Sequence, residues 1–68
     1  MCLAIPGKII KIEKGKATVE YPGLTRFALI GDEKVKIRDY VMVQMGIVVK
    51  ILTPKEAREA LRAWTQNI

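Results

Sequence analysis

The sequence predicts a small, mainly β domain in which a barrel of five or six short strands is followed by one C-terminal helix. Segments rich in β-branched residues recur between residues 8 and 52, and turn-forming residues separate them. Helix-start signals then follow at Thr53. The 68 residues leave room for a single domain over 1–68, with the barrel over about 3–52 and the helix over about 54–65.

The first three strands are predicted from alternation and turn chemistry. Apolar and polar residues alternate along Lys8–Glu13, and the turn at 14–16 leads into Ala17–Tyr21, which predicts a β-hairpin. Pro22-Gly23 is a strong turn signal. A third strand is therefore predicted over Leu24–Ile30, ending at Gly31.

The remaining strands are predicted from apolar runs. Val35 and Ile37 are expected to extend a sheet edge. The nearly continuous apolar run Tyr40–Met45 is typical of a strand that is buried on both faces or crosses a barrel. Gly46 permits a bend before the last strand, Ile47–Leu52. Short antiparallel strands of this number favour a closed or partly open barrel, OB-like or SH3-like, and the sequence leaves the strand order open.

The C-terminal helix is predicted from its start signals and its apolar stripe. Thr53 serves as N-cap, Pro54 suits the first helical position, and Glu56 completes a capping box. The helix is expected to dock on the barrel, with its Trp acting in docking rather than as an interaction hot spot. The stripe consists of Ala57, Ala60, Leu61 and Trp64.

The side-chain inventory excludes most enzyme classes. The chain has one cysteine and no histidine, so it offers no Ser-His or Cys-His pair, no internal disulfide and no closed tetrahedral zinc site. Its carboxylates are scattered among lysines, and no glycine-rich phosphate loop is present. We therefore expect that the protein is not an enzyme by itself.

The cysteine count and the hydropathy pattern predict a location. A single unpaired cysteine is tolerated where thiols are kept reduced. No secretory signal is visible ahead of Pro6-Gly7, and the apolar runs are too short to span a bilayer. The expected location is the cytoplasm, without membrane association.

The net charge of +5 raises the question of nucleic-acid binding. Lysines alternate with apolar residues along the predicted strands, acidic residues lie among them, and aromatic residues are few. Specific nucleic-acid binding is therefore not expected, although a basic OB-like nucleic-acid-binding module is the leading alternative. A structural adaptor whose N-terminal segment adds to a partner's sheet edge is a third possibility.

Cys2 is the residue that carries chemistry. A lone cysteine is commonly a buried packing residue, but a thiolate near the start of a chain can reach into a partner's metal site as a soft ligand. Leu3, Ile5 and Pro6 are expected to form an apolar contact surface around the thiol. Pro6-Gly7 is either an ordinary strand-entry turn or a direct partner contact.

The N-terminal residues Met1-Cys2-Leu3-Ala4-Ile5-Pro6-Gly7-Lys8 resemble the signature of the HypC/HupF family of hydrogenase maturation chaperones. The resemblance continues through Gly23-Leu24-Thr25-Arg26, through Asp39–Val43 and through the C-terminal helix, so it covers nearly the whole chain. One departure is Gln44, where the family often has histidine; glutamine neither titrates near neutral pH nor binds metals well.

The resemblance implies an OB-like barrel that acts as a metallochaperone in nickel–iron hydrogenase maturation. Such chaperones bind a HypD-type iron–sulfur protein, on which iron acquires cyanide and carbonyl ligands, and carry this iron group to the hydrogenase large-subunit precursor. Cys2 corresponds to the family's shared iron ligand, so iron would be held transiently and jointly with a partner. The expected partner-binding residues are Cys2, Leu3, Ile5, Pro6 and Gly7.

Overall fold

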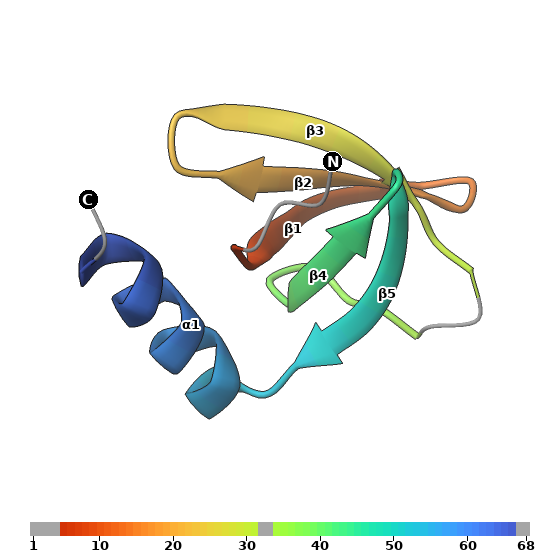
Figure 1. Cartoon of the computed structure of the whole chain (residues 1–68). Coiled ribbons are helices and arrows are strands. Elements are labelled where there is room, and N and C mark those ends of the chain that lie inside the picture. The colour runs from red at the N-terminus through yellow and green to blue at the C-terminus, as the bar shows by residue number, and fades with distance from the viewer. Residues whose placement is uncertain (1–4, 32–33, 67–68) are drawn as a thin grey trace.

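The structure is a computed structural model that describes residues 5–31 and 34–66, with side chains described as far as residue 63. Five strands close into a barrel in the order β1-β2-β3-β5-β4, and one helix follows (Figure 1). The mainly β, OB-like barrel with a C-terminal helix is thereby confirmed. The elements are β1 (Gly7–Glu13), β2 (Lys16–Tyr21), β3 (Leu24–Leu29), β4 (Tyr40–Gln44), β5 (Ile47–Leu52) and α1 (Pro54–Gln66).

The expectation that all strands would be antiparallel is wrong at one junction. β3 and β5 run parallel and are joined at a single registered pair, Leu29 with Ile47, whereas the other neighbouring strands are antiparallel. The direction follows from the other pairings, because β2 is antiparallel to β1 and β3, and β4 is antiparallel to β1 and β5, so β1, β3 and β5 run in the same direction. The barrel is consequently closed at one end of β3 only.

The predicted edge extension at Val35 and Ile37 is also wrong, because this segment forms no strand. Val35 packs half-buried against the core, and Ile37 is exposed. The backbone is instead used in a turn: the Lys36 N–H donates to Asp39 Oδ2 at 2.9 Å, and the Asp39 N–H donates to the Lys36 carbonyl at 3.0 Å. These bonds direct the chain into β4.

A β-bulge in β1 shifts the alternation of its side chains. Ile9 pairs with Val19 and Lys11 pairs with Thr18, so Ile10 has no registered partner on β2. Because of the extra residue, Ile9 and Ile12 both pack on the core although they are three residues apart. The register between β4 and β5 shifts in the same way, and there Val48 and Ile51 both pack on the core.

Of the two alternatives for the run Tyr40–Met45, a strand of a barrel is confirmed and a strand buried on both faces is wrong. Only Val41 is fully buried in β4, because a barrel has a single interior and strand residues alternate between its two faces. Met45 lies beyond the strand and is 89% exposed in a two-residue turn with Gly46. Their φ values of 53° and 76° are both positive, as a type I′ hairpin turn requires.

Gly7 lies where the first strand enters the core. The fully buried side chains of Ile9, Val19 and Val41 form the centre of the barrel, and Tyr21 is 5% exposed beside them. A Cβ at Gly7 would overlap Val19 and would lie 2.8 Å from the Tyr21 ring. Only glycine therefore lets β1 pack this closely against β2.

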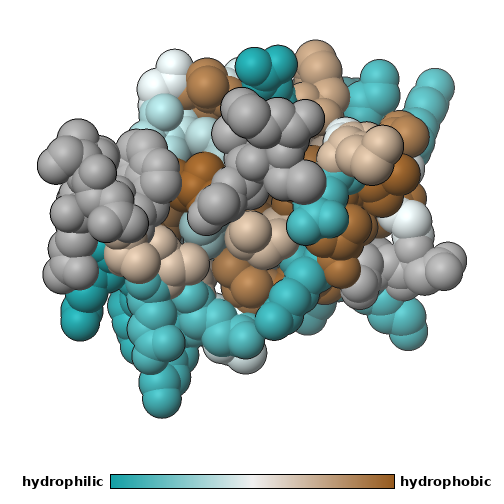
Figure 2. All heavy atoms as spheres, viewed as in Figure 1, coloured by the Kyte–Doolittle hydropathy of each residue, from teal (hydrophilic) through white to brown (hydrophobic). Residues whose placement is uncertain are grey.

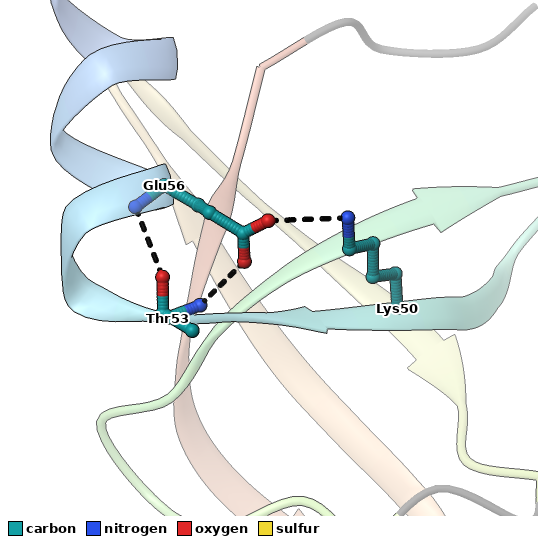
Figure 3. Close-up of polar contacts among 3 residues, drawn as sticks. All are labelled: Lys50, Thr53 and Glu56. Carbon is teal, nitrogen blue, oxygen red and sulfur yellow. Dashed lines mark hydrogen bonds and ion pairs between the residues drawn. The ribbon is translucent and has the colours of Figure 1, made fainter.

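The predicted capping box is confirmed at the start of α1 (Figure 3). The Glu56 N–H donates to Thr53 Oγ1 at 3.1 Å, and the Thr53 N–H donates to Glu56 Oε1 at 3.0 Å. Lys50 on β5 forms an ion pair with Glu56 at 3.4 Å, which links the cap to the barrel. No helix among the described residues is long and apolar enough to cross a bilayer.

The cap lowers the pKa of Glu56, chiefly because the Thr53 N–H stabilises the carboxylate and secondly because of Lys50. The folded pKa is therefore lower than the unfolded one. The stabilisation from this carboxylate is present above its ordinary pKa of 4.5 and is lost as the pH falls through the lowered value.

The apolar stripe of α1 packs as predicted over its described part. Ala57 is buried, and Ala60 and Leu61 are half-buried, with Leu61 against the barrel core. The predicted docking role of Trp64 concerns a side chain outside the described part of the chain.

We predict that Gly7→Ala destabilises the protein by about 1–3 kcal/mol, because the added methyl group overlaps Val19 and crowds the Tyr21 ring. Gly31→Ala is the matched control, since nothing lies within 4 Å of a Cβ there and its φ is not positive. Urea unfolding measures both variants. Equal stability of the two would show that β1 is not held in this close contact.

We predict that Thr53→Ala lowers the free energy of unfolding by about 1 kcal/mol, because the Glu56 N–H loses its acceptor. Thr53→Ser keeps a hydroxyl at the same position and should remain within a few tenths of a kcal/mol of the original protein. Denaturant unfolding at neutral pH compares them. A serine variant as unstable as the alanine variant would contradict a role for the hydroxyl.

Candidate functional site

The predicted site residues divide into two groups. Cys2 and Leu3 lie outside the described residues, whereas Ile5, Pro6 and Gly7 are all buried. Ile5 is 5% exposed and belongs to the core cluster. Pro6 is buried as well. The expected apolar contact surface around the thiol, formed by Leu3, Ile5 and Pro6, stays a prediction. The three buried residues Ile5, Pro6 and Gly7, which we call the anchor, hold the chain from the third residue after Cys2.

A cleft opens beside this anchor. Its volume is about 420 Å³, and Pro6 and Lys8 line it together with Tyr40 from β4 and Leu61 from α1. The cleft thus lies where the start of β1 meets β4 and the helix. The remaining lining residues are Glu20, Tyr21, Pro22 and Gly23.

A second hollow adjoins the same two side chains. Its volume is about 340 Å³. Tyr40 and Leu61 line both this hollow and the first cleft. Arg38 and Arg58 supply positive charge to its lining. Arg38 has a φ of 81°, an unusual conformation for a residue with a side chain, and its N–H donates to the Ile9 carbonyl at 2.7 Å. The junction of barrel and helix is therefore hollowed on both sides of Tyr40.

The cleft beside Pro6 combines an apolar wall with hydrogen-bond donors. Burial raises the pKa of Tyr21, and the positive charge of Arg26 opposes this shift in part, so the phenol is neutral at physiological pH. Lys8 and Glu20 are directly opposed in the β1–β2 register. The cleft can accept an apolar group, and the neutral phenol and the ammonium can donate to an electron-rich one.

Sequence reasoning missed this cleft because its walls come from distant segments. Tyr21 ends β2 and Tyr40 begins β4, so each tyrosine stands beside a turn. An aromatic residue at a strand end is a signal for a rim position, but only the barrel closure shows that both tyrosines meet near Pro6. Their convergence could not be read from either strand alone.

Gln44 lies away from this cleft. It is the exposed last residue of β4, whereas Tyr40 at the first position lines the cleft. Gln44 is four residues after Tyr40 in the strand, so their Cα atoms lie roughly 13 Å apart. The departure from histidine at Gln44 therefore does not alter the surroundings of Pro6. Within 5–31 and 34–66, no three potential metal-ligating side chains form a group that could hold an ion.

Comparison with known proteins gives matches over almost the full chain. The protein is 38% identical over 69 residues to hydrogenase maturation factor HypC of Helicobacter hepaticus, covering 97% of this chain and 80% of that protein. It is 31% identical to the protein of the same name from Escherichia coli K12, covering 93% of this chain and 78% of that protein.

The alignment with a more distant relative also covers most of both chains. The HypC of Synechocystis sp. PCC 6803 is 29% identical, with 90% of each chain covered. The model of the HupF/HypC family matches residues 1–64, which include Cys2, the anchor, the whole barrel and most of α1. The chain therefore belongs to the HupF/HypC family.

Proposed function

We propose that this protein is a metallochaperone in nickel–iron hydrogenase maturation. Its relatives are named hydrogenase maturation factors, and its family match includes Cys2. It would collect an iron group with cyanide and carbonyl ligands from a HypD-type iron–sulfur protein in the cytoplasm and carry it to the large-subunit precursor. The observation that supports the proposal is the buried anchor at Ile5, Pro6 and Gly7, which begins three residues after the only cysteine.

The anchor limits how far the thiol can travel from the barrel. Three peptide steps separate Cys2 from Ile5, so their Cα atoms lie at most about 11 Å apart. Ile5 is fixed in the core, and Pro6 lines the cleft between β1, β4 and α1. The chain length therefore allows the Cys2 thiol to reach a partner bound at this hollow.

The chemistry of a single thiolate suits a carrier. Cys2 supplies one soft ligand, and the partner would supply the remaining ligands, so the iron group is shared and can be released. Lys8 and the neutral Tyr21 phenol are the donors of the cleft that suit the electron-rich nitrogen atoms of cyanide. In this role the protein binds and transfers the group without catalysing its formation.

We predict that Cys2→Ala abolishes hydrogenase maturation in a host lacking the native protein while leaving the melting temperature unchanged. Cys2 precedes the first strand, where truncating a side chain costs well under the several kcal/mol of a core deletion. Cys2→Ser, which keeps the shape but replaces the thiol by a hydroxyl, should fail equally. Hydrogenase activity and thermal unfolding are the two measurements.

Ile5→Ala is the contrasting variant, because it removes a core side chain and should lower the melting temperature. Normal maturation by both Cys2 variants would refute the carrier role.

One observation favours the nucleic-acid alternative. Phe27 on β3 is 70% exposed, and Lys16 Nζ on β2 lies 5.4 Å from its ring centroid. The face formed by the second and third strands is the one with which OB folds bind oligonucleotides. However, the exposed neighbours Leu29 and Ile47 are aliphatic, and stacking of successive bases requires further aromatic platforms.

We predict no specific binding of single- or double-stranded oligonucleotides at physiological salt. The reason is that the described part of this face offers a single exposed aromatic side chain, Phe27. Fluorescence anisotropy at increasing salt measures the affinity. Submicromolar binding that survives moderate salt and is lost in Phe27→Ala would make the OB-like nucleic-acid module the better description.

A further inference from the structure

The outer edge of β3 lacks a strand partner along most of its length. β2 pairs with β3 from Leu24 to Leu29, but on the opposite side β5 pairs only at Leu29. We call residues Leu24–Ala28, on the side away from β2, the β3 edge. Among residues 5–31 and 34–66, no strand pairs with this edge, and Figure 1 shows β5 diverging from it.

The hydrogen-bond pattern identifies which backbone groups face outward. The Leu29 N–H donates to the Gly46 carbonyl at 2.7 Å, on the β5 side, whereas the Ile30 N–H donates to the Gly15 carbonyl at 2.8 Å, on the β2 side. Backbone groups of successive strand residues alternate between the two edges. The N–H and C=O groups of Thr25 and Phe27 therefore point along the β3 edge, away from β2.

Apolar surface continues from this edge. Four exposed side chains, which we call the apolar patch, belong to residues at or next to the β3–β5 junction. Leu29 and Ile47 are registered neighbours, and Figure 2 shows apolar atoms reaching solvent on the right of the view, where β3 and β5 meet. The apolar patch consists of Phe27 (70% exposed), Leu29 (56%), Met45 (89%) and Ile47 (43%).

Charge decides what fits this edge. Arg26 is the only charged residue of β3, its side chain alternates with that of Phe27, and Lys16 lies opposite Leu29 on β2. Glu20 lies opposite Thr25 at the start of β3, so the positive charge is concentrated between Arg26 and the end of β3 at Leu29. A second copy of this chain would bring its own arginine and a net charge of +5 to the pairing. An acidic strand is favoured instead.

We propose that the β3 edge binds an extended segment of a partner protein in which apolar and acidic side chains alternate. The segment adds as a further strand and pairs with the backbone of Thr25 and Phe27. Its apolar side chains lie on the apolar patch, and its carboxylates face Arg26 on the other side of the added strand. All the residues that define this surface lie on β3, β5 and the turn between β4 and β5.

The test uses nuclear magnetic resonance with a capped peptide of about six residues, the length of a typical strand, in which valine alternates with glutamate. The amide protons of Thr25 and Phe27 should shift and exchange more slowly with solvent as peptide is added. Those of Arg26 and Ala28 already face β2 and should change less. A peptide with lysine in place of glutamate should bind at least about fivefold more weakly.

Arg26→Glu should weaken binding of the glutamate peptide by at least about fivefold and improve binding of the lysine peptide. Lys55→Glu is the matched control, with the same charge change at an exposed helix position, and should bind like the original protein. Equal affinity for both peptides, shifts confined to the cleft beside Pro6, or no saturable binding would overturn the proposal. Slow exchange of the Thr25 and Phe27 amide protons without peptide, caused by self-association, would also overturn it. The same holds if an oligonucleotide shifts these amide protons and binds more tightly than the glutamate peptide.

Discussion

The close packing of Gly7 against Val19 and Tyr21 is the contact on which the arrangement depends. Because glycine has no side chain, β1 enters the barrel with its backbone against the core, and Ile5 and Pro6 are drawn into the interior with it. The chain is thereby held in the core at Ile5, three residues after Cys2.

The two ends of the barrel have different properties. At one end, the start of β1 meets Tyr40 and α1 around a cleft with hydrogen-bond donors. At the other, β3 and β5 join at Leu29 and Ile47, and apolar side chains reach solvent. A carrier that must meet a donor and then a recipient needs a chemical site and a surface for recognition, and the barrel offers a candidate for each at separate places.

Much of the fold follows from local signals, and the exceptions have physical causes. The hairpin turns, the capping box at Thr53 and the helix are short-range features, so residue types at fixed spacing predict them. The β-bulges at Ile10 and Val49 depend on how two strands share one interior, and the parallel β3–β5 junction depends on which strands become neighbours when the barrel closes. The burial of Ile5 and the convergence of Tyr21 with Tyr40 likewise arise only when the barrel closes. The proposed role of Cys2 came from its chemistry together with the family resemblance.

The central claim is that Cys2 holds an iron group jointly with a partner. The most direct measurement is infrared spectroscopy of the protein co-purified with a HypD-type partner from a host that makes the iron group. The account predicts cyanide and carbonyl bands in the complex containing the original protein, and their loss in the complex containing Cys2→Ser at equal protein content. Bands of undiminished intensity in the Cys2→Ser complex, with the iron group still transferred to the large-subunit precursor, would contradict it.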